Sequence, residues 1–385
     1  MNNSVASRIS SLHIAISWAT EGAGGSGRVT ADLAKYLPAQ GVEFFGAVAA
    51  PADVAEVTGG RILNFAPDTS STWRRLLGAR RTLTQIINEK KPQIVASHFA
   101  LYTIPALDRL NRSTHIVHFH GPWSAESREE GASGVTAAFK HRVEKAVYGK
   151  AARVIVLSRA FAEVVVRSYG VPEEIVRIVP GAVDVERFAV PESREQARDI
   201  LGWPKDRRIL VSVRRLVNRM GLGTLIAAMR RVSKEHPDTV LYIAGKGRLR
   251  ETLEAQIEQS GLQQRVKLLG FVPDAKLPLI YRAADMNVVP TLALEGFGLV
   301  AAEALAAGTP SVVTPVGGLP EVVASLSESL TFPSSDQEDL ERHLVTLLSH
   351  PNLLPSEDAC RSYAAEHFNA SLMAKRTADV YREVL

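Results

Sequence analysis

The stretch EGFGLVAAEALAAG, residues 295–308, stands between two apolar runs, 286–290 and 311–315. That order predicts a strand, a glycine-rich turn, a buried helix over residues 299–307 and a second strand. One charged residue, Glu303, lies inside the apolar helix, where a lone carboxylate is costly unless a partner hydrogen-bonds to it. Glu295 lies at the mouth of the same helix, beside backbone N–H groups that a helix start leaves unpaired. Two carboxylates and a helix N-terminus suit a polyhydroxylated, anionic ligand.

Length and composition indicate a globular, two-domain protein. A chain of 385 residues is long for one core, and 46% apolar and 22% charged residues are ordinary for a globular chain. The single cysteine, Cys360, fits a reducing compartment. The first twenty residues show no continuous apolar segment before a cleavage site, and no run of 18 apolar residues occurs. We therefore expect a cytoplasmic protein that does not span the membrane and has no nucleic-acid partner.

The net charge of +4 makes the chain mildly basic. Solubility is the favoured explanation, ahead of attraction to phosphates or to an anionic membrane surface.

Both halves of the chain alternate strands with helix-length segments. Apolar strands are expected at 13–18, 42–49, 94–98, 115–120, 153–157 and 175–179, and again at 209–213, 240–244, 266–269 and 286–290. This alternation predicts parallel sheets. The charged, proline-containing stretch 190–208 marks the boundary between lobes. We expect an α/β protein with two Rossmann-like lobes facing across a cleft, residues 1–190 and 191–370, and a final helix, 371–385, that packs back on the first lobe.

A glycine-rich loop follows the first expected strand. Gly22, Gly24 and Gly27 satisfy G-x-G-x-x-G, the pattern of dinucleotide-binding turns. The acidic residue that would confirm this reading belongs at the end of the second strand, which is apolar; Glu43 has the spacing but stands at the start of that strand. A phosphate or substrate loop is therefore favoured, and a simple tight turn is the alternative.

Three histidines in HIVHFH, residues 115–120, raise the question of a metal. His118 and His120 share one face of a strand, which is reachable geometry for a metal ion. No nearby cysteine or acidic cluster completes a ligand set, so we expect no metal and a packed His118. His120 ends its strand, where open α/β sheets place ligand-binding groups.

Residues 72–91, TWRRLLGARRTLTQIINEKK, predict a basic amphipathic helix led by Trp73. Such a helix is more often a solvated face of a Rossmann-like layer, and contact with an anionic membrane is the alternative.

Several motifs stand in a fixed order along the chain. E-x7-E in EGFGLVAAE precedes AGTPSVVTPVGGLPEVV, and both follow VPGAVDVERF, VRRLVNRMGLGTLI, YIAGKGRLR and FVPDAKLPLIYRAADMNVVPT. On these motifs nearly the whole chain resembles the retaining glycosyltransferases of the family-four group (glycosyl transferases group one), which have the GT-B fold. The resemblance implies a hexosyltransferase without a further cofactor, using a nucleotide-sugar donor and a sugar or lipid-linked sugar acceptor. No D-x-D acid pair stands beside a strand end in the expected place, so a divalent metal is not needed. The basic helix with Trp73 motivates a lipid-linked acceptor, as in cell-surface polysaccharide or glycolipid assembly.

The resemblance also implies a role for individual residues. Glu303 would hold the ribose hydroxyls, Glu295 and His120 the donor sugar, and Arg215 the diphosphate. The implied catalytic residues are His120, Glu295 and Arg215. The implied donor-binding residues are Gly24, Gly25, Arg215, Arg219, Gly245, Val272, Glu295, Gly296, Phe297, Gly298, Leu299 and Glu303.

One position departs from the family pattern. Met220 stands where the family usually carries a phosphate-binding lysine, and a thioether cannot donate to a phosphate. Arg219 or Arg214 could supply the charge, Arg215 and the helix N-terminus could act alone, or activity could be reduced or lost; retained activity is favoured. A sugar-nucleotide 2-epimerase and a non-catalytic binding protein remain alternatives. UDP, GDP, ADP and dTDP sugars all fit the motifs.

Overall fold

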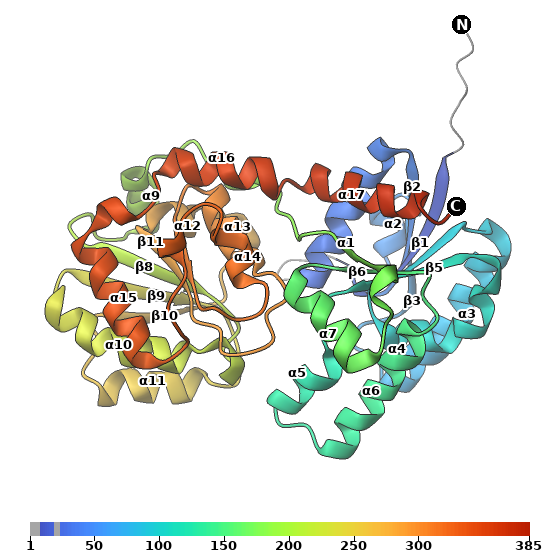
Figure 1. Cartoon of the computed structure of the whole chain (residues 1–385), viewed down its shortest axis with the longest axis horizontal. Helices are drawn as coiled ribbons and strands as arrows, with labels where there is room; N and C mark the ends of the chain where they lie inside the picture. The colour runs from blue at the N-terminus through green and yellow to red at the C-terminus, as the bar shows by residue number, and fades with distance from the viewer. Residues whose placement is uncertain (1–7, 19–23) are drawn as a thin grey trace, which may run out of the picture. The chain divides into compact units, whose positions relative to one another are not determined.

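The computed structural model describes residues 8–18 and 24–385 and shows two compact units (Figure 1). Unit 1 runs to Gly181 and includes residues 370–385, and unit 2 comprises residues 182–369. The division therefore falls after Gly181, nine residues before the boundary expected from composition. Phe188 shows why: this residue of α8 (Val185–Phe188) is buried, and its ring centroid lies 6.0 Å from that of Tyr281 in unit 2.

Unit 1 is built on seven parallel strands in the order β3-β2-β1-β4-β5-β6-β7. The strands are β1 (Ile9–Ser17), β2 (Val42–Ala49), β3 (Ile62–Ala66), β4 (Ile94–Ser97), β5 (Thr114–Phe119), β6 (Arg153–Val156) and β7 (Val176–Ile178). The strand order reverses direction between β1 and β4, and ligands bind at such switch points, beyond the carboxyl ends of the strands. The predicted α/β class with parallel sheets is confirmed.

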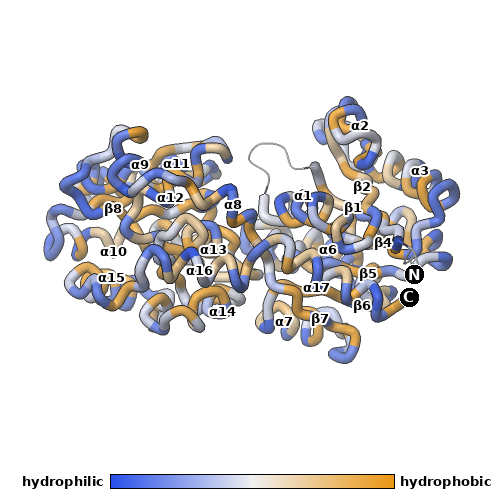
Figure 2. The backbone as a smooth tube through the Cα atoms, turned by 90° about the horizontal axis from the view of Figure 1, so that it is seen from above, coloured by the Kyte–Doolittle hydropathy of each residue, from blue (hydrophilic) through white to orange (hydrophobic). Residues whose placement is uncertain are grey.

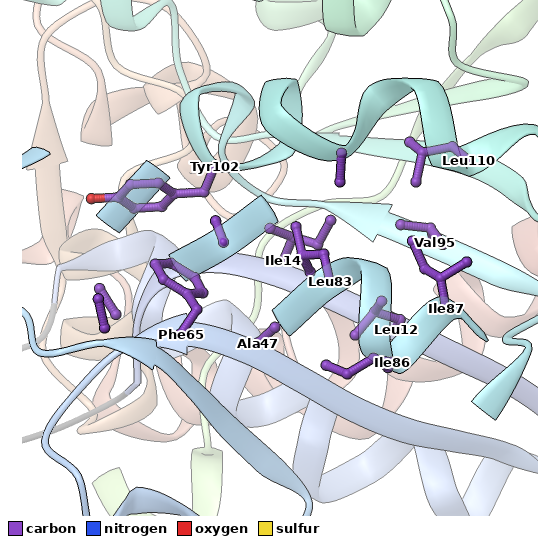
Figure 3. Packing of buried hydrophobic residues seen from close by; sticks show 14 residues of the cluster. Leu12, Ile14, Ala47, Phe65, Leu83, Ile86, Ile87, Val95, Tyr102 and Leu110 are labelled. Atoms are coloured by element: carbon purple, nitrogen blue, oxygen red, sulfur yellow. The ribbon is translucent and has the colours of Figure 1, made fainter. Parts of the chain in front are cut away.

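Helices cover the sheet of unit 1. They are α1 (Gly25–Tyr36), α2 (Val54–Val57), α3 (Thr72–Lys90), α4 (Ala100–Thr103), α5 (Trp123–Glu129), α6 (Gly134–Tyr148), α7 (Arg159–Tyr169) and α17 (Ala370–Arg382). Figure 3 shows the packing of α3: Leu83, Ile86 and Ile87, spaced three and four residues apart on one helix face, lie against Leu12 and Ile14 of β1. Burying each such side chain stabilises the fold by about 1.5–3 kcal/mol.

The last helix, α17, belongs to unit 1 although unit 2 lies between them in the sequence (Figure 1). Tyr381 is fully buried in unit 1, and its hydroxyl lies 2.9 Å from Nε2 of His118. Arg153 of β6 and Arg177 of β7 both pair with Glu383, just beyond the helix. Side chains of the far C-terminus therefore complete the core and one edge of unit 1.

Unit 2 is built on five parallel strands in the order β10-β9-β8-β11-β12. They are β8 (Arg208–Val213), β9 (Thr239–Ala244), β10 (Val266–Gly270), β11 (Met286–Val289) and β12 (Ser311–Val313). Its longer helices are α9 (Arg194–Leu201), α10 (Leu222–Glu235), α11 (Arg250–Gln259), α12 (Leu277–Ala283), α13 (Leu299–Ala306), α14 (Leu319–Val323), α15 (Gln337–Ser349) and α16 (Glu357–His367).

The helices of unit 2 differ in hydropathy according to their burial. Helix α9 is drawn mostly in hydrophilic blue in Figure 2, and it begins with a capping box formed by Ser193 and Gln196. Helix α13 is apolar apart from Glu303, and six of its residues, from Ala301 to Ala306, are buried. The predicted buried helix at 299–307 is thus observed, one residue shorter. No helix in the described residues is long and apolar enough to cross a membrane.

Candidate functional site

The carboxylate of Glu295 is fixed by Arg214 at the start of α13. One guanidinium nitrogen of Arg214 donates to Glu295 Oε2 and to the hydroxyl of Thr291. The two charged side chains are only 7% and 15% exposed. The backbone carbonyl of Glu295 also accepts a hydrogen bond from Gly318 N, at 2.9 Å. Glu295 is therefore held in one orientation, and removing either charge would leave the other one poorly solvated.

The glycine-rich turn brings the backbone close to α14. Gly298 has φ +91°, and a Cβ there would lie 2.4 Å from Cδ2 of Leu319, so only glycine fits without strain. Gly296 is buried, and the Phe297 ring packs edge-on against Phe368 at 5.3 Å. Leu299 is the first residue of α13, whose first N–H groups point out of the helix start. The turn thus presents a rigid helix N-terminus next to Glu295.

Glu303 is 2% exposed and has a partner inside the fold. The hydroxyl of Tyr281, on α12, donates to Glu303 Oε2 at 3.0 Å. The hydroxyl of Thr309 donates to the backbone carbonyl of the same tyrosine, at 2.7 Å. The tyrosine hydroxyl is therefore one hydrogen-bond partner of this buried charge within unit 2.

The segment after β8 carries the three arginines named from the sequence. Arg215 is exposed, whereas Arg219 is 7% exposed and donates to the carbonyl of Leu294 at 3.0 Å. Leu294 has φ +58°, which is rare for a leucine, so the buried arginine braces a strained loop directly before Glu295. Met220 is 5% exposed, and its thioether is packed away from solvent.

Gly245 follows β9 at the same carboxyl edge of the sheet. It has φ +148°, and a Cβ there would lie 1.8 Å from the carbonyl oxygen of Arg214. Its N–H donates to the carbonyl of Gly270 at 2.7 Å, and the half-buried Val272 follows two residues later. The ends of β8, β9, β10 and β11 thus bring together the unit 2 residues predicted for the site.

Unit 1 carries the remaining predicted residues. His120 follows β5, and its Nε2 lies 2.8 Å from Nδ1 of His98. Burial lowers the pKa of His120 to about 4, so the ring is neutral at physiological pH. Gly24 and Gly25 are exposed at the start of α1, and a Cβ on Gly24 would meet no atom within 4 Å. Gly22 lies outside the described residues.

The histidine-rich strand gives no sign of a metal site. His118 is 5% exposed and paired with Tyr381, as a packed histidine should be. Among residues 8–18 and 24–385, no group of three histidine, cysteine or acidic side chains is placed to hold a metal ion.

Sequence reasoning missed four residues that support the site: Tyr281, Thr291, His98 and His13. Tyr281 lies on α12, His13 lies on β1, and Thr291 and His98 follow β11 and β4. Their contacts depend on how these elements pack, which the sequence alone does not show. Arg214, one of the two arginines offered in place of the missing lysine, forms an ion pair with Glu295.

Two units, each with a parallel α/β sheet, give the chain the GT-B fold of solved glycosyltransferases. Sucrose-phosphate synthase from Thermosynechococcus elongatus has this fold with a TM-score of 0.82, 24% identity and coverage of 98% of this chain and 99% of that one. Anabaena HepE in complex with UDP and glucose gives a TM-score of 0.80, 20% identity and coverage of 97% and 100%.

Sequence comparison then identifies the family. The model of glycosyl transferases group 1 matches residues 193–367, and that of glycosyltransferase family 4 matches residues 23–187. The chain belongs to this family of glycosyltransferases. D-inositol 3-phosphate glycosyltransferase of Streptomyces bingchenggensis is 32% identical over 251 residues, which are 63% of this chain and 55% of that protein. The chain spans about half the length of the curated relatives it matches.

Proposed function

We propose that this protein transfers a sugar from a nucleoside-diphosphate sugar to an acceptor hydroxyl, with retention of anomeric configuration and without a metal ion. The observation that carries the proposal is two fixed carboxylates, one in the turn just before α13 and one on α13 itself. Glu295 is locked by Arg214 at the helix start, and Glu303 is buried one turn inside, held by Tyr281. Fixed carboxylates accept hydrogen bonds from vicinal hydroxyls, and the helix start favours a phosphate.

Each carboxylate would act on a different part of the donor. Glu303 would accept hydrogen bonds from the ribose hydroxyls. The hydrogen bond from the Tyr281 hydroxyl to Oε2 would hold the Glu303 carboxylate in its orientation. Glu295 would hold hydroxyls of the donor sugar and support the positive charge that develops at the anomeric carbon. Its carboxylate is committed to Arg214, so we assign Glu295 to positioning the sugar and not to general-base catalysis.

The diphosphate would be stabilised without the usual lysine. Arg215 is exposed at the carboxyl end of β8, and the N–H groups at the start of α13 add the positive end of a helix dipole. Arg219 is committed to the carbonyl of Leu294, so its contribution would be to keep the loop before Glu295 in place. Front-face attack would then let a leaving phosphate oxygen take the acceptor proton.

Thermal shift with UDP, GDP, ADP, dTDP and their sugars tests this proposal first, because a ligand at 100 times its Kd stabilises by about 2.7 kcal/mol. Glu303→Gln should weaken nucleotide binding about tenfold or more, since hydrogen bonds to a charged group are worth about 1.5–3 kcal/mol. Glu295→Gln should lower turnover while leaving nucleotide affinity near wild type. The matched control is Glu251→Gln, on the exposed surface of α11.

The products of the reaction separate the alternatives. Slow release of free sugar and nucleotide supports a transferase. A transfer product that keeps the anomeric configuration of the donor supports retention. An isomerised sugar nucleotide identifies an epimerase, and binding without turnover identifies a non-catalytic protein. An equal loss of nucleotide affinity in both glutamate variants, with turnover unchanged, would contradict the division of roles.

We further propose that the acceptor is lipid-linked, in cell-surface polysaccharide or glycolipid assembly at the cytoplasmic face of a membrane. Trp73 and Leu77, one turn apart on α3, are 69% and 56% exposed. Arg74 and Arg81 are exposed on the same helix. Aromatic and basic side chains on one helix suit an anionic headgroup layer.

The structure narrows the choice of arginines for a test. Arg80 pairs with Asp108, and Arg75 lies over the ring of Tyr102, so both have structural partners. Charge reversal at Arg74 and Arg81 should therefore abolish co-sedimentation with phosphatidylglycerol vesicles. The control is the same reversal at Arg230 and Lys234, exposed on α10 of unit 2. Undiminished vesicle binding by the α3 variant would refute the membrane role.

A further inference from the structure

Three histidines from adjacent strands of unit 1 form a continuous hydrogen-bonded chain. Nε2 of His13, on β1, lies 3.1 Å from the Ser11 hydroxyl, and its Nδ1 lies 2.9 Å from Nε2 of His98. Nδ1 of His98, directly after β4, lies 2.8 Å from Nε2 of His120. The chain thus runs from the interior of the sheet to the carboxyl end of β5, where the predicted site residue stands.

The Ser11 end gives this chain a direction. The Ser11 hydroxyl has one proton, and it donates that proton to the carbonyl of Glu43 at 2.9 Å. Ser11 Oγ must therefore accept from Nε2–H of His13. A neutral imidazole carries one N–H, so Nδ1 of His13 is an acceptor and takes the Nε2–H of His98. His98 then has a bare Nδ1, which accepts the Nε2–H of His120. His120 is therefore protonated at Nε2 and bare at Nδ1.

This assignment of protons requires neutral rings, and the surroundings of His13, His98 and His120 favour the neutral form. Burial lowers the pKa of His13 to about 3 and that of His120 to about 4, and the pKa of His98 is lowered well below its ordinary value by burial and the neighbouring rings. The ring of His118 stacks on His98 at 4.4 Å and is itself held by Tyr381. His118 therefore holds the His98 ring from one side, and Ser11 holds the inner end of the hydrogen-bonded histidines.

The outer end of the chain is an unused acceptor. Nδ1 of His120 is buried and has no hydrogen-bond partner among the described residues. A buried acceptor without a partner destabilises the protein unless a ligand or water supplies a donor. The bare nitrogen selects for a group that carries a proton to donate, such as a hydroxyl, and against an ether, a ketone or a missing hydroxyl.

We propose that Ser11, His13 and His98 are positioning residues that hold His120 as the Nε2–H tautomer, so that His120 Nδ1 accepts a hydrogen bond from one hydroxyl of the donor sugar. The inference rests on the proposed function for the identity of the hydroxyl. The donor-to-acceptor direction of the hydrogen bonds from Ser11 to His120 depends only on residues of unit 1.

Nitrogen NMR tests the direction without any substrate. In the ¹⁵N-histidine-labelled full chain at pH 7.5, long-range ¹H–¹⁵N correlations distinguish a protonated from a bare ring nitrogen. The His120 resonances are assigned by their absence in His120→Gln. We expect His120 to carry its proton on Nε2. A proton on Nδ1 of His120, or a doubly protonated ring, would overturn the proposal.

Variants at His98 test the effect on the reaction. His98→Phe keeps a planar ring against His118 but removes the acceptor for His120, so kcat/KM for the preferred donor sugar should fall about tenfold. His98→Asn can place a carbonyl oxygen near the former Nδ1, and it should recover part of that loss. His115→Phe is the matched control, because His115 is also buried on β5 but pairs with Ser97, outside the chain.

Selectivity provides a readout that a merely structural role would not move. Wild type should prefer the donor sugar over one of its monodeoxy analogues by about tenfold, and His98→Phe should lose that preference. Wild-type selectivity and kcat/KM in His98→Phe would overturn the proposal. If His98→Phe does not fold, Ser11→Ala serves instead: its His120 should no longer show a single tautomer. Absence of turnover with every sugar nucleotide, with the NMR result as expected, would refute the proposed function and leave the chain's direction established.

Discussion

Acidification should destabilise unit 1 because it holds several histidines neutral. Burial lowers the pKa of His13 to about 3 and that of His115 and His120 to about 4. In the unfolded chain the same rings have their ordinary pKa of 6.5. Between these values the unfolded state binds more protons than the folded state, so stability is complete above pH 6.5 and falls as the pH drops toward 4.

The size of the effect follows from the same values. At pH 5.5, one unit below the pKa in the unfolded chain, each ring that the fold keeps neutral lowers the free energy of unfolding by about 1.4 kcal/mol. Three such rings reduce the free energy of unfolding by about 4 kcal/mol relative to pH 7.5, and the lowered pKa values of His98 and His118 act in the same direction. That is a large part of the roughly 5–15 kcal/mol by which a domain is stable.

Urea unfolding at pH 7.5 and 5.5, read by hydrogen exchange in β1, β4 and β5, measures this loss. With a slope of about 2 kcal/mol per molar urea, the midpoint for unit 1 should fall by about 2 M. His115→Phe removes one titrating ring and should reduce the loss by about 1.4 kcal/mol. A midpoint for these strands that does not change between the two pH values would refute the reasoning, since carboxylates contribute little above pH 5.

Three other predictions concern single side chains. Gly298→Ala should lower the free energy of unfolding by about 1–3 kcal/mol, because it strains a positive φ and meets Leu319; Gly24→Ala, with open space around its Cβ, is the control, and equal urea midpoints would contradict this account. Glu144→Ala should cost about 3 kcal/mol or more, because it leaves two buried backbone N–H groups and two tyrosine hydroxyls without their acceptor; a wild-type melting temperature would disprove it. Cys360, fully buried with a pKa raised to about 12, should react with iodoacetamide at pH 8 only after unfolding; fast labelling of the native protein would argue against this.

The sequence allowed most of the fold to be predicted because its buried strands are short apolar runs separated by helices. The expected strand at 42–49 has the observed bounds, and the helix at 299–307 differs by one residue. Strand β3, ILNFA, was missed, because it is a short edge strand interrupted by Asn64. The boundary shifted to Gly181 because burial of Phe188 in unit 2 is a tertiary contact, which composition does not reveal.

The site was predictable where one residue is chemically out of place. Glu303 is conspicuous as a charge inside an apolar helix, and the structure does bury it. Arg214 and Arg215 directly follow β8, and which of the two turns toward Glu295 depends on the path of the backbone beyond the strand, which the sequence does not show. His13, His98 and His120 are far apart in sequence, and their alignment depends on β1, β4 and β5 being neighbours.

The return of α17 to unit 1 sets an order for folding during synthesis. Unit 2 is a continuous segment, residues 182–369, and all of it leaves the ribosome before Tyr381 does. Unit 1 cannot bury His118 against Tyr381, or close the edge held by Glu383, until that last helix has emerged. Domains usually fold from the N-terminus as they are made. In this chain the second unit has all of its residues first, so the core of the first unit can be completed only after its neighbour has been synthesised.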